Sequence, residues 1–398
     1  MTAPAIQAGV RERWRMGLEA RALLLVTAIL MSFGLAVLYS ASALQALSAG
    51  SPGHFFVLRQ ATGVLAGVVA FAIFAKMDAE IWRKYAWPIM GISIFLMLVI
   101  ILPGTESIST RVYGSRRYLF GGSIQPSELA KFAILVWTPM LLVKKGAMVR
   151  RLGKGLMPFA VVIGTLSVLA ALEPDLSVAM MFCLLMAVLL FVGGARVSHF
   201  LLFGVVGLLL VGYQASQSPY VKARVDAFFG EDNTPGRTNA SPVNDQQYQS
   251  LVAVGAGGLV GVGLGQGNQQ RGWLPLAYND FIGSIVGEEF GFIGIAGLTL
   301  AFALYGWLGF RIARQARSPY CTLLAIGLTF TTVFTAFIHL GVVIRLLPNT
   351  GLTLPFVSYG RSNLVLTLAM TGILVNIGSM RERVFGTSAT DPLVTVPS

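Results

Sequence analysis

Several charged side chains of this sequence stand within or beside long apolar runs, where each charge costs ~2.5–3.5 kcal/mol on membrane-insertion scales. Glu128 and Lys131 lie three residues apart, so a helix places them on one face within ion-pair reach. Pro126, just before them, is typical of the first turn of a helix. The pair indicates either a salt bridge that lets a helix enter the bilayer or a charged binding site.

Three arginines precede that pair: Arg111, Arg116 and Arg117. The distribution of Lys and Arg along the chain places them on the outer side of the membrane. A guanidinium group can hold a phosphate through two parallel hydrogen bonds. Outside arginines do not set membrane topology. They therefore indicate either contact with lipid headgroups or the binding of a phosphorylated substrate.

A second group of carboxylates forms a very short turn between two apolar runs, Glu173-Pro174-Asp175. Asp175 is a residue type that caps helix N-termini. A substrate site is the alternative.

Asp280 follows Asn279 at the mouth of a long apolar run, with Glu288 and Glu289 about two helical turns further along. Asp280 could cap that helix, or it could act as a base at the membrane surface. The glycine-rich run 255–267 comes before it and lacks the Gly-Lys-Ser/Thr ending of a phosphate loop. Small residues also permit close helix packing in membranes.

The stretch 345–363 is broken by prolines and glycines beside an apolar run. Such backbone at membrane depth is tolerated where protein or a cavity buries it, so we weigh a functional segment against a plain outer loop. His339 stands alone within an apolar run, which favours an interhelical hydrogen bond over a proton relay. No zinc spacing and no hydrolase motif is present in the sequence.

Long apolar runs must position these residues. Hydrophobic residues make up 55% of the chain and charged residues only 12%, about half the charged fraction of a soluble domain. We therefore expect an all-α, polytopic membrane protein with about ten transmembrane helices. The expected runs are 22–43, 58–75, 85–102, 129–143, 156–172, 176–192, 200–215, 281–310, 320–344 and 364–377.

The distribution of Lys and Arg sets the expected orientation. Their densest clusters, such as Lys144–Lys154 and Arg311–Arg317, fall on the side of both termini, which the positive-inside rule makes cytoplasmic. The net charge of +12 then reports topology and not nucleic-acid binding. We expect a cytoplasmic segment 1–21, a membrane domain 22–380 with a large extracytoplasmic loop 216–280 between helices 7 and 8, and a disordered cytoplasmic tail 381–398.

Four segments in this order resemble the SEDS family of cell-wall synthases, of the FtsW, RodA and SpoVE type. The matching pieces are Ile124–Lys131, Glu173–Leu176, the glycine-rich run to Leu274-Pro275 followed by Asp280–Ile282, Glu288-Glu289 and Gly291, and Leu352–Phe356 with Ser358–Gly360. The Leu-Thr-Leu-Pro-Phe motif looks more like the division-type members than the elongation-type ones. Tyr118 departs from the family, which usually has Trp there.

The resemblance implies a glycosyltransferase that polymerises lipid II, an undecaprenyl-diphosphate-linked substrate, into peptidoglycan on the outer face of the bacterial inner membrane. Asp280 falls on the family's proposed catalytic Asp and would deprotonate the acceptor hydroxyl. Cations would neutralise the diphosphate leaving group. The expected substrate-binding residues are Arg116, Arg117, Glu128, Lys131, Asp175, Gln269, Glu288 and Ser358.

The resemblance also implies partners: a class B penicillin-binding protein, which is a transpeptidase, and other membrane proteins of the division or elongation machinery. We expect no tightly held cofactor, and leave open whether a divalent cation, Mg²⁺ or Mn²⁺, takes part. Two alternatives remain from the residues themselves. Broken spans and intramembrane charges also suit a transporter that flips lipid II, and the chain could be a non-catalytic scaffold for a transpeptidase.

Overall fold

The computed structural model describes residues 9–102, 104–105, 109–112, 115–119, 125–173, 175–199, 242–386 and 394–395. Nine of the expected apolar runs are helices there, and the tenth, 200–215, lies outside the described residues. The nine are α1 (Leu18–Ser48), α2 (Phe55–Lys76), α3 (Ile81–Ile101), α4 (Pro126–Lys145), α5 (Met157–Leu172), α6 (Leu176–Val192), α11 (Ile282–Arg314), α12 (Pro319–Val343) and α13 (Arg361–Ile377).

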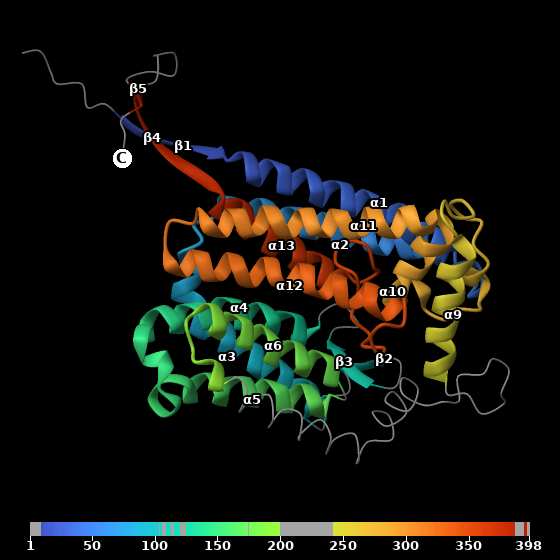
Figure 1. The fold of residues 1–398 in the computed structure, drawn as a ribbon, viewed down its shortest axis with the longest axis horizontal. Helices are drawn as coiled ribbons and strands as arrows, with labels where there is room; N and C mark the ends of the chain where they lie inside the picture. The colour runs from blue at the N-terminus through green and yellow to red at the C-terminus, as the bar shows by residue number, and fades with distance from the viewer. Residues whose placement is uncertain are drawn as a thin grey trace, which may run out of the picture.

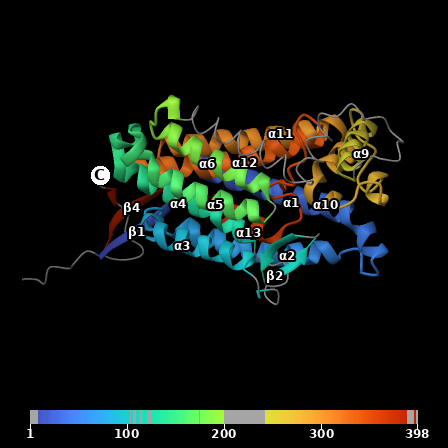
Figure 2. The same cartoon turned by 90° about the horizontal axis from the view of Figure 1, so that it is seen from below.

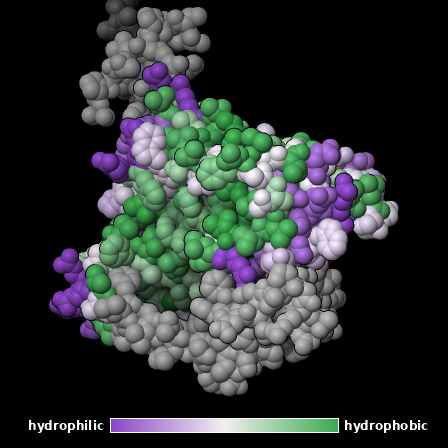
Figure 3. Space-filling model, turned by 45° about the vertical axis from the view of Figure 1, so that its right-hand side comes forward, coloured by the Kyte–Doolittle hydropathy of each residue, from purple (hydrophilic) through white to green (hydrophobic). Residues whose placement is uncertain are grey.

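Seven helices in the described part of the chain are long and apolar enough to cross a membrane: α1 to α5, α11 and α12. The apolar helices α6 and α13 are shorter. Figure 3 shows a broad hydrophobic area over the middle of one face, with hydrophilic residues toward its edges. Large apolar side chains such as Leu65 and Phe95 are more than half exposed, as expected where lipid replaces water.

The helices run along one another, with the two chain ends together at one end of the bundle (Figure 1). There, β1 (Gly9–Met16) pairs antiparallel with β4 (Ser379–Gly386), and β4 pairs with β5 (Val394–Thr395). The start of the tail that we expected to be disordered is therefore a strand. The 3₁₀-helix η1 (Gly146–Arg150) and the π-helix η2 (Leu152–Leu156) connect α4 to α5.

The opposite end of the bundle, which we name the site end, carries the remaining short elements (Figures 1 and 2). These are the hairpin β2 (Ser109–Val112) and β3 (Ser115–Leu119), helix α9 (Pro242–Gly257), the 3₁₀-helix η3 (Gln269–Arg271) and helix α10 (Ala277–Asp280). The segment between α9 and α11, predicted as part of a large loop, thus contains helical turns that cover this end.

Helix starts follow signals that the sequence carries. Pro126 occupies the first turn of α4, where its missing N–H costs nothing. Asp175 caps α6, accepting a hydrogen bond of 3.2 Å from the backbone N–H of Val178. The capping interpretation of Asp175 is therefore confirmed.

Helix α11 is not the single continuous span that we expected, because it breaks at Gly291, which has φ 64° and ψ −157°. The backbone groups freed by the break need partners in a membrane protein. The glycine-rich segment after α9 supplies them through four hydrogen bonds: Val262 N to Glu288 O (3.0 Å), Gly263 N to Glu289 O (3.0 Å), Phe292 N to Gly258 O (2.9 Å) and Ile293 N to Leu259 O (3.1 Å).

This contact explains the glycines. A Cβ on Gly257 would lie 1.9 Å from the carbonyl oxygen of Gly287, and one on Gly261 would lie 2.1 Å from that of Glu289. Any side chain at either position would push the segment away from α11. The glycine-rich run is therefore the backbone partner of a broken helix, in line with the close-packing interpretation.

Candidate functional site

The predicted ion pair at the start of α4 is present. Lys131 Nζ lies 2.6 Å from Glu128 Oε1, and both residues are buried. Asn363, at the start of α13, donates a hydrogen bond of 3.3 Å to the other carboxylate oxygen of Glu128. A buried charge pair persists only when further hydrogen bonds satisfy it, and here α4 and α13 together supply them.

A second charged contact links the hairpin to the α5–α6 turn. Arg117 Nη1 lies 3.3 Å from Asp175 Oδ2, and Arg117 Nε donates to the carbonyl oxygen of Glu173 at 3.4 Å. Asp175 thus both caps α6 and holds an arginine. Arg116 belongs to β3, but its side chain lies outside the described part, as does that of Arg111, so their phosphate-binding role stays a prediction.

Tyr118, beside Arg117 on β3, shows that the predicted segments meet. Burial, together with the negative charges of Asp280, Glu128 and Asp175, raises the pKa of its hydroxyl to about 12, while Arg117 opposes them. The charges that act on this phenol thus come from β3, α4, the α5–α6 turn and α10. We refer to these four charged residues and Tyr118 as the Tyr118 group.

Asp280 is half-buried and ends helix α10. Phe281, and not Asp280, occupies the N-cap position of α11, so the capping alternative for Asp280 is wrong. Its Oδ2 lies 3.7 Å from the position that a Cβ on Gly351 would take. The carboxylate therefore faces the Pro/Gly-broken segment 345–360, which we name the strap.

Hydrogen bonds fix the strap against the Asp280 segment. Ser358 Oγ donates to the carbonyl oxygen of Asn279 at 2.7 Å and accepts from Leu354 N at 2.8 Å. Tyr359 N donates to the carbonyl oxygen of Tyr278 at 3.0 Å. Ser358 therefore positions the backbone next to Asp280, and its direct contact with substrate stays a prediction.

His339 on α12 joins the strap to α11. Its Nδ1 lies 2.9 Å from the carbonyl oxygen of Leu352, and Gly283 N donates to its Nε2 at 3.3 Å. Because a carbonyl only accepts, Nδ1 carries the proton and Nε2 is the acceptor. The interhelical hydrogen bond expected of His339 is confirmed.

Glu288 on α11 and Gln269 at the start of η3, both predicted to bind substrate, contact each other. Glu288 Oε1 accepts hydrogen bonds from the backbone N–H groups of Asn268 (2.7 Å) and Gln269 (3.3 Å). Both residues are buried. The contacts give Glu288 a structural task, that of holding the start of η3 to α11, and leave the predicted substrate contacts as predictions.

Comparison with known proteins settles the family. The family model for cell cycle proteins of the FtsW, RodA and SpoVE type matches residues 20–383. The chain belongs to this family. Our interpretation of the motifs as a SEDS signature is thereby confirmed.

Two relatives illustrate the FtsW, RodA and SpoVE membership. The chain is 34% identical over 372 residues to the probable peptidoglycan glycosyltransferase FtsW of Trichlorobacter lovleyi, covering 93% of this chain and 96% of the relative. It is 35% identical over 358 residues to stage V sporulation protein E of Bacillus subtilis, covering 89% and 95%.

Two solved structures share the fold. One is a chain of a peptidoglycan synthase complex, with a TM-score of 0.72, 24% identity and coverage of 89% of this chain and 96% of that one. The other is the rod shape determining protein RodA of Thermus thermophilus, with a TM-score of 0.64, 23% identity and coverage of 89% and 95%. At these identities the two structures establish the polytopic family fold.

Sequence reasoning missed two residues of this family member's site. Tyr118 was noticed only as a departure from the usual Trp. Gln60 on α2 is buried and binds the end of the strap through both atoms of its amide. Its Nε2 donates to the carbonyl oxygen of Ser358 (3.2 Å), and its Oε1 accepts from Gly360 N (3.1 Å). An amide within an apolar run was the available signal for Gln60.

The described residues contain no group of three or more His, Cys, Asp or Glu side chains placed to hold a metal ion. Two carboxylates of the Tyr118 group are instead paired with cations, Glu128 with Lys131 and Asp175 with Arg117. We derive no step through a metal.

Proposed function

We propose that this chain is a peptidoglycan glycosyltransferase that polymerises lipid II into glycan strands for cell division or cell-shape maintenance. The observation that carries the proposal is a half-buried carboxylate, Asp280, at the end of the bundle that also holds the ion pairs Arg117–Asp175 and Lys131–Glu128 (Figure 1). A relative that matches nearly the whole chain bears the name of such an enzyme, which supports the proposal.

In this proposal Asp280 is the general base. It takes the proton of the acceptor sugar hydroxyl while that oxygen forms a bond to the anomeric carbon of the donor. The bond from the same carbon to the undecaprenyl diphosphate breaks, and the anomeric centre inverts. A positioned base typically contributes about 10²–10⁴-fold to such a rate.

Arg117 and Lys131 would stabilise the departing diphosphate. Each is already held by a carboxylate, at 3.3 Å from Asp175 and 2.6 Å from Glu128 respectively. Fixed cations cost no reorganisation when charge develops on the departing phosphate oxygens. Glu128 and Asp175 then act by positioning the cations.

We further propose that the site end faces the outside of the bacterial inner membrane. The basic residues Arg311 and Arg314 lie in the last turn of α11, and Arg311 pairs at 3.3 Å with Glu19 near the start of α1, at the end where the chain termini lie. The positive-inside rule makes that end cytoplasmic. Lipid-linked sugars on the outer leaflet would then reach Asp280, where a class B penicillin-binding protein can crosslink the product.

The test is polymerisation of fluorescent lipid II by the full-length protein together with its class B penicillin-binding protein, in detergent, with and without chelator. We expect Asp280→Asn to lower the rate of strand formation by about 10²–10⁴-fold. Asp78→Asn, which alters a carboxylate at the opposite end of the bundle, is the matched control and should polymerise normally.

Unchanged strand formation by Asp280→Asn would refute the role of the base. Movement of lipid II across liposomes by wild-type protein, without strands under any condition, would instead support the transporter alternative. Chelator resistance would show that Mg²⁺ and Mn²⁺ are dispensable.

A further inference from the structure

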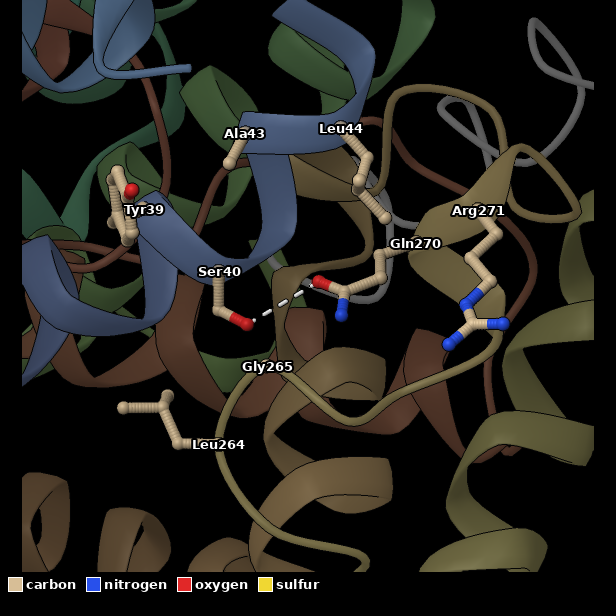
Figure 4. Close-up of a pocket in the computed structure, with 8 residues that line it drawn as sticks. All are labelled: Tyr39, Ser40, Ala43, Leu44, Leu264, Gly265, Gln270 and Arg271. Carbon is tan, nitrogen blue, oxygen red and sulfur yellow. Dashed lines mark hydrogen bonds between the residues drawn. The ribbon is translucent and has the colours of Figure 1, made fainter. Parts of the chain in front are cut away.

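A cavity of about 630 Å³ lies at the site end, between the last turns of α1 and the segment that runs from the glycine-rich run into η3 (Figure 4). The residues that line it come from neither α4 nor the hairpin, and neither Arg117 nor Lys131 is among them. No residue predicted from the sequence lines it.

One side of the cavity is polar and built from buried groups. Ser40 and Gln270 are each 7% exposed, and Ser40 Oγ lies 3.2 Å from Gln270 Oε1. Ser40 also contacts the carboxylate of Glu289, and its single proton can serve only one of these two acceptors at a time. Glu289 Oε2 is buried and has no hydrogen-bond partner among the described residues. This network has acceptor capacity left for a ligand hydroxyl.

The other side is apolar and open. Tyr39 is 53% exposed, Leu44 42% and Leu264 53%, and all three line the cavity. They stand on or beside a helix that crosses the membrane, so an aliphatic chain in the bilayer can lie along them. Arg271, also exposed, completes the lining with a guanidinium group (Figure 4).

Cation, hydroxyl-binding groups and apolar wall together fit a lipid whose phosphate carries a sugar. The phosphate would pair with Arg271, the sugar hydroxyls would meet Gln270 and Ser40, and the hydrocarbon chain would follow Tyr39 and Leu44. A phospholipid headgroup shares the phosphate chemistry, and the experiment below separates the two sources.

Polymerisation requires two such lipids at once. The donor loses its diphosphate, whereas the acceptor supplies a hydroxyl and keeps its own. One set of cations cannot hold both diphosphates, because each carries at least two negative charges. Arg117 and Lys131 would serve the group that departs, so a second cation is needed for the group that stays.

The connection between η3 and α10 favours the acceptor as the lipid that the cavity serves. Arg271 ends η3 and Asp280 ends α10, so a short stretch of the same segment joins them, and both elements contact α1. A base must stand next to the acceptor hydroxyl. We infer that this cavity holds the diphosphate of the acceptor lipid II, with Arg271 as its cationic partner. This inference rests on the proposed function.

The inference predicts a particular kinetic effect. A diphosphate that stays bound unchanged is held equally in the ground state and the transition state, so losing its partner raises KM and leaves kcat alone. We expect Arg271→Ala to raise KM for lipid II about tenfold, the effect of losing about 1.4 kcal/mol of binding, with kcat within about twofold of wild type. Arg271→Lys should restore part of the affinity.

Arg314→Ala, which removes an exposed arginine at the opposite end, is the matched control and should leave KM unchanged. Ala43→Trp, which fills the cavity, should raise KM as Arg271→Ala does, and thermal unfolding of each variant verifies that it folds. A fall in kcat with KM unchanged in Arg271→Ala would place Arg271 on the leaving group and overturn the inference. Unchanged kcat and KM in Arg271→Ala would also overturn it.

Binding in nanodiscs of phosphatidylcholine identifies the source of the phosphate. We expect added undecaprenyl diphosphate to raise the Tm of wild-type protein more than that of Arg271→Ala, while phosphatidylglycerol acts on both alike. An Arg271-dependent effect of phosphatidylglycerol alone would make this a phospholipid site and overturn the inference. If wild-type protein makes no strands, the proposed function fails, while the nanodisc comparison still reports on the cavity.

Discussion

Replacing Glu173 by Gln should make the protein more stable at alkaline pH. Glu173 lies in the α5–α6 turn, is 3% exposed, and has an oxygen without a hydrogen-bond partner among the described residues. Burial, and secondarily the charge of Asp175, raises the pKa of its carboxyl from 4.5 to about 8, against the opposing charge of Arg117. The folded protein therefore retains a proton that the unfolded chain has lost.

The sign and size of the effect follow from proton linkage. Because the folded-state pKa is the higher one, stability is greatest below pH 4.5 and falls as the pH rises toward 8, above which this contribution is constant. The interval from 4.5 to about 8 corresponds to a loss of about 5 kcal/mol, at 1.36 kcal/mol for each pH unit. Glutamine keeps the neutral shape at every pH and avoids this loss.

The assay is thermal unfolding in detergent at pH 5 and pH 8.5. We expect Glu173→Gln and wild type to have similar Tm at pH 5, and the variant to have the higher Tm at pH 8.5. Asp78→Asn, at the partly exposed ion pair with Arg317, should keep the wild-type difference between the two pH values. Equal alkaline destabilisation of wild type and Glu173→Gln would refute the assignment of a buried, neutral Glu173.

Two further predictions concern packing and charge. Gly261→Ala should lower the free energy of unfolding by about 1–3 kcal/mol from the positive φ of 82° alone. The added Cβ would also meet the carbonyl oxygen of Glu289, which lowers stability further. A lowered Tm is the expected result, and a Tm equal to wild type would contradict the contact at the α11 break. Lys131→Met leaves Glu128 buried without its cation and should destabilise by about 3–5 kcal/mol. The double variant Glu128→Gln with Lys131→Met should recover much of that loss in denaturant titration, and an additive loss would argue against the pairing.

Much of this architecture could be predicted from local signals. Apolar runs located nine helices of the described chain, because a bilayer dictates the length and composition of each span. The spacing of Glu128 and Lys131 predicted their contact, since residues three apart share a helix face. His339 was predicted to bond between helices, since a lone buried imidazole needs partners.

The features that sequence could not supply depend on contacts between distant segments. The break at Gly291 is stable because the glycine-rich segment satisfies its backbone groups. The apolar run contains several glycines, and no local signal marks this one as the break. Asp280 was open between capping and catalysis; the N-cap of α11 is Phe281, and the role of Asp280 as a base stays a prediction. Tyr118 became informative only when charges from three other segments were found around it.

The way the strap is fastened limits how this protein can be altered. Its backbone bonds to the side chains of Gln60 on α2 and His339 on α12, and to the carbonyl oxygen of Tyr278 on α10. The side chain of its own Ser358 adds bonds to Leu354 N and to the carbonyl oxygen of Asn279. A chimera that imports the strap from a relative must therefore also carry side chains at positions 60 and 339 that can bond to it. We expect grafts of the strap alone to fold less well than grafts that include both positions.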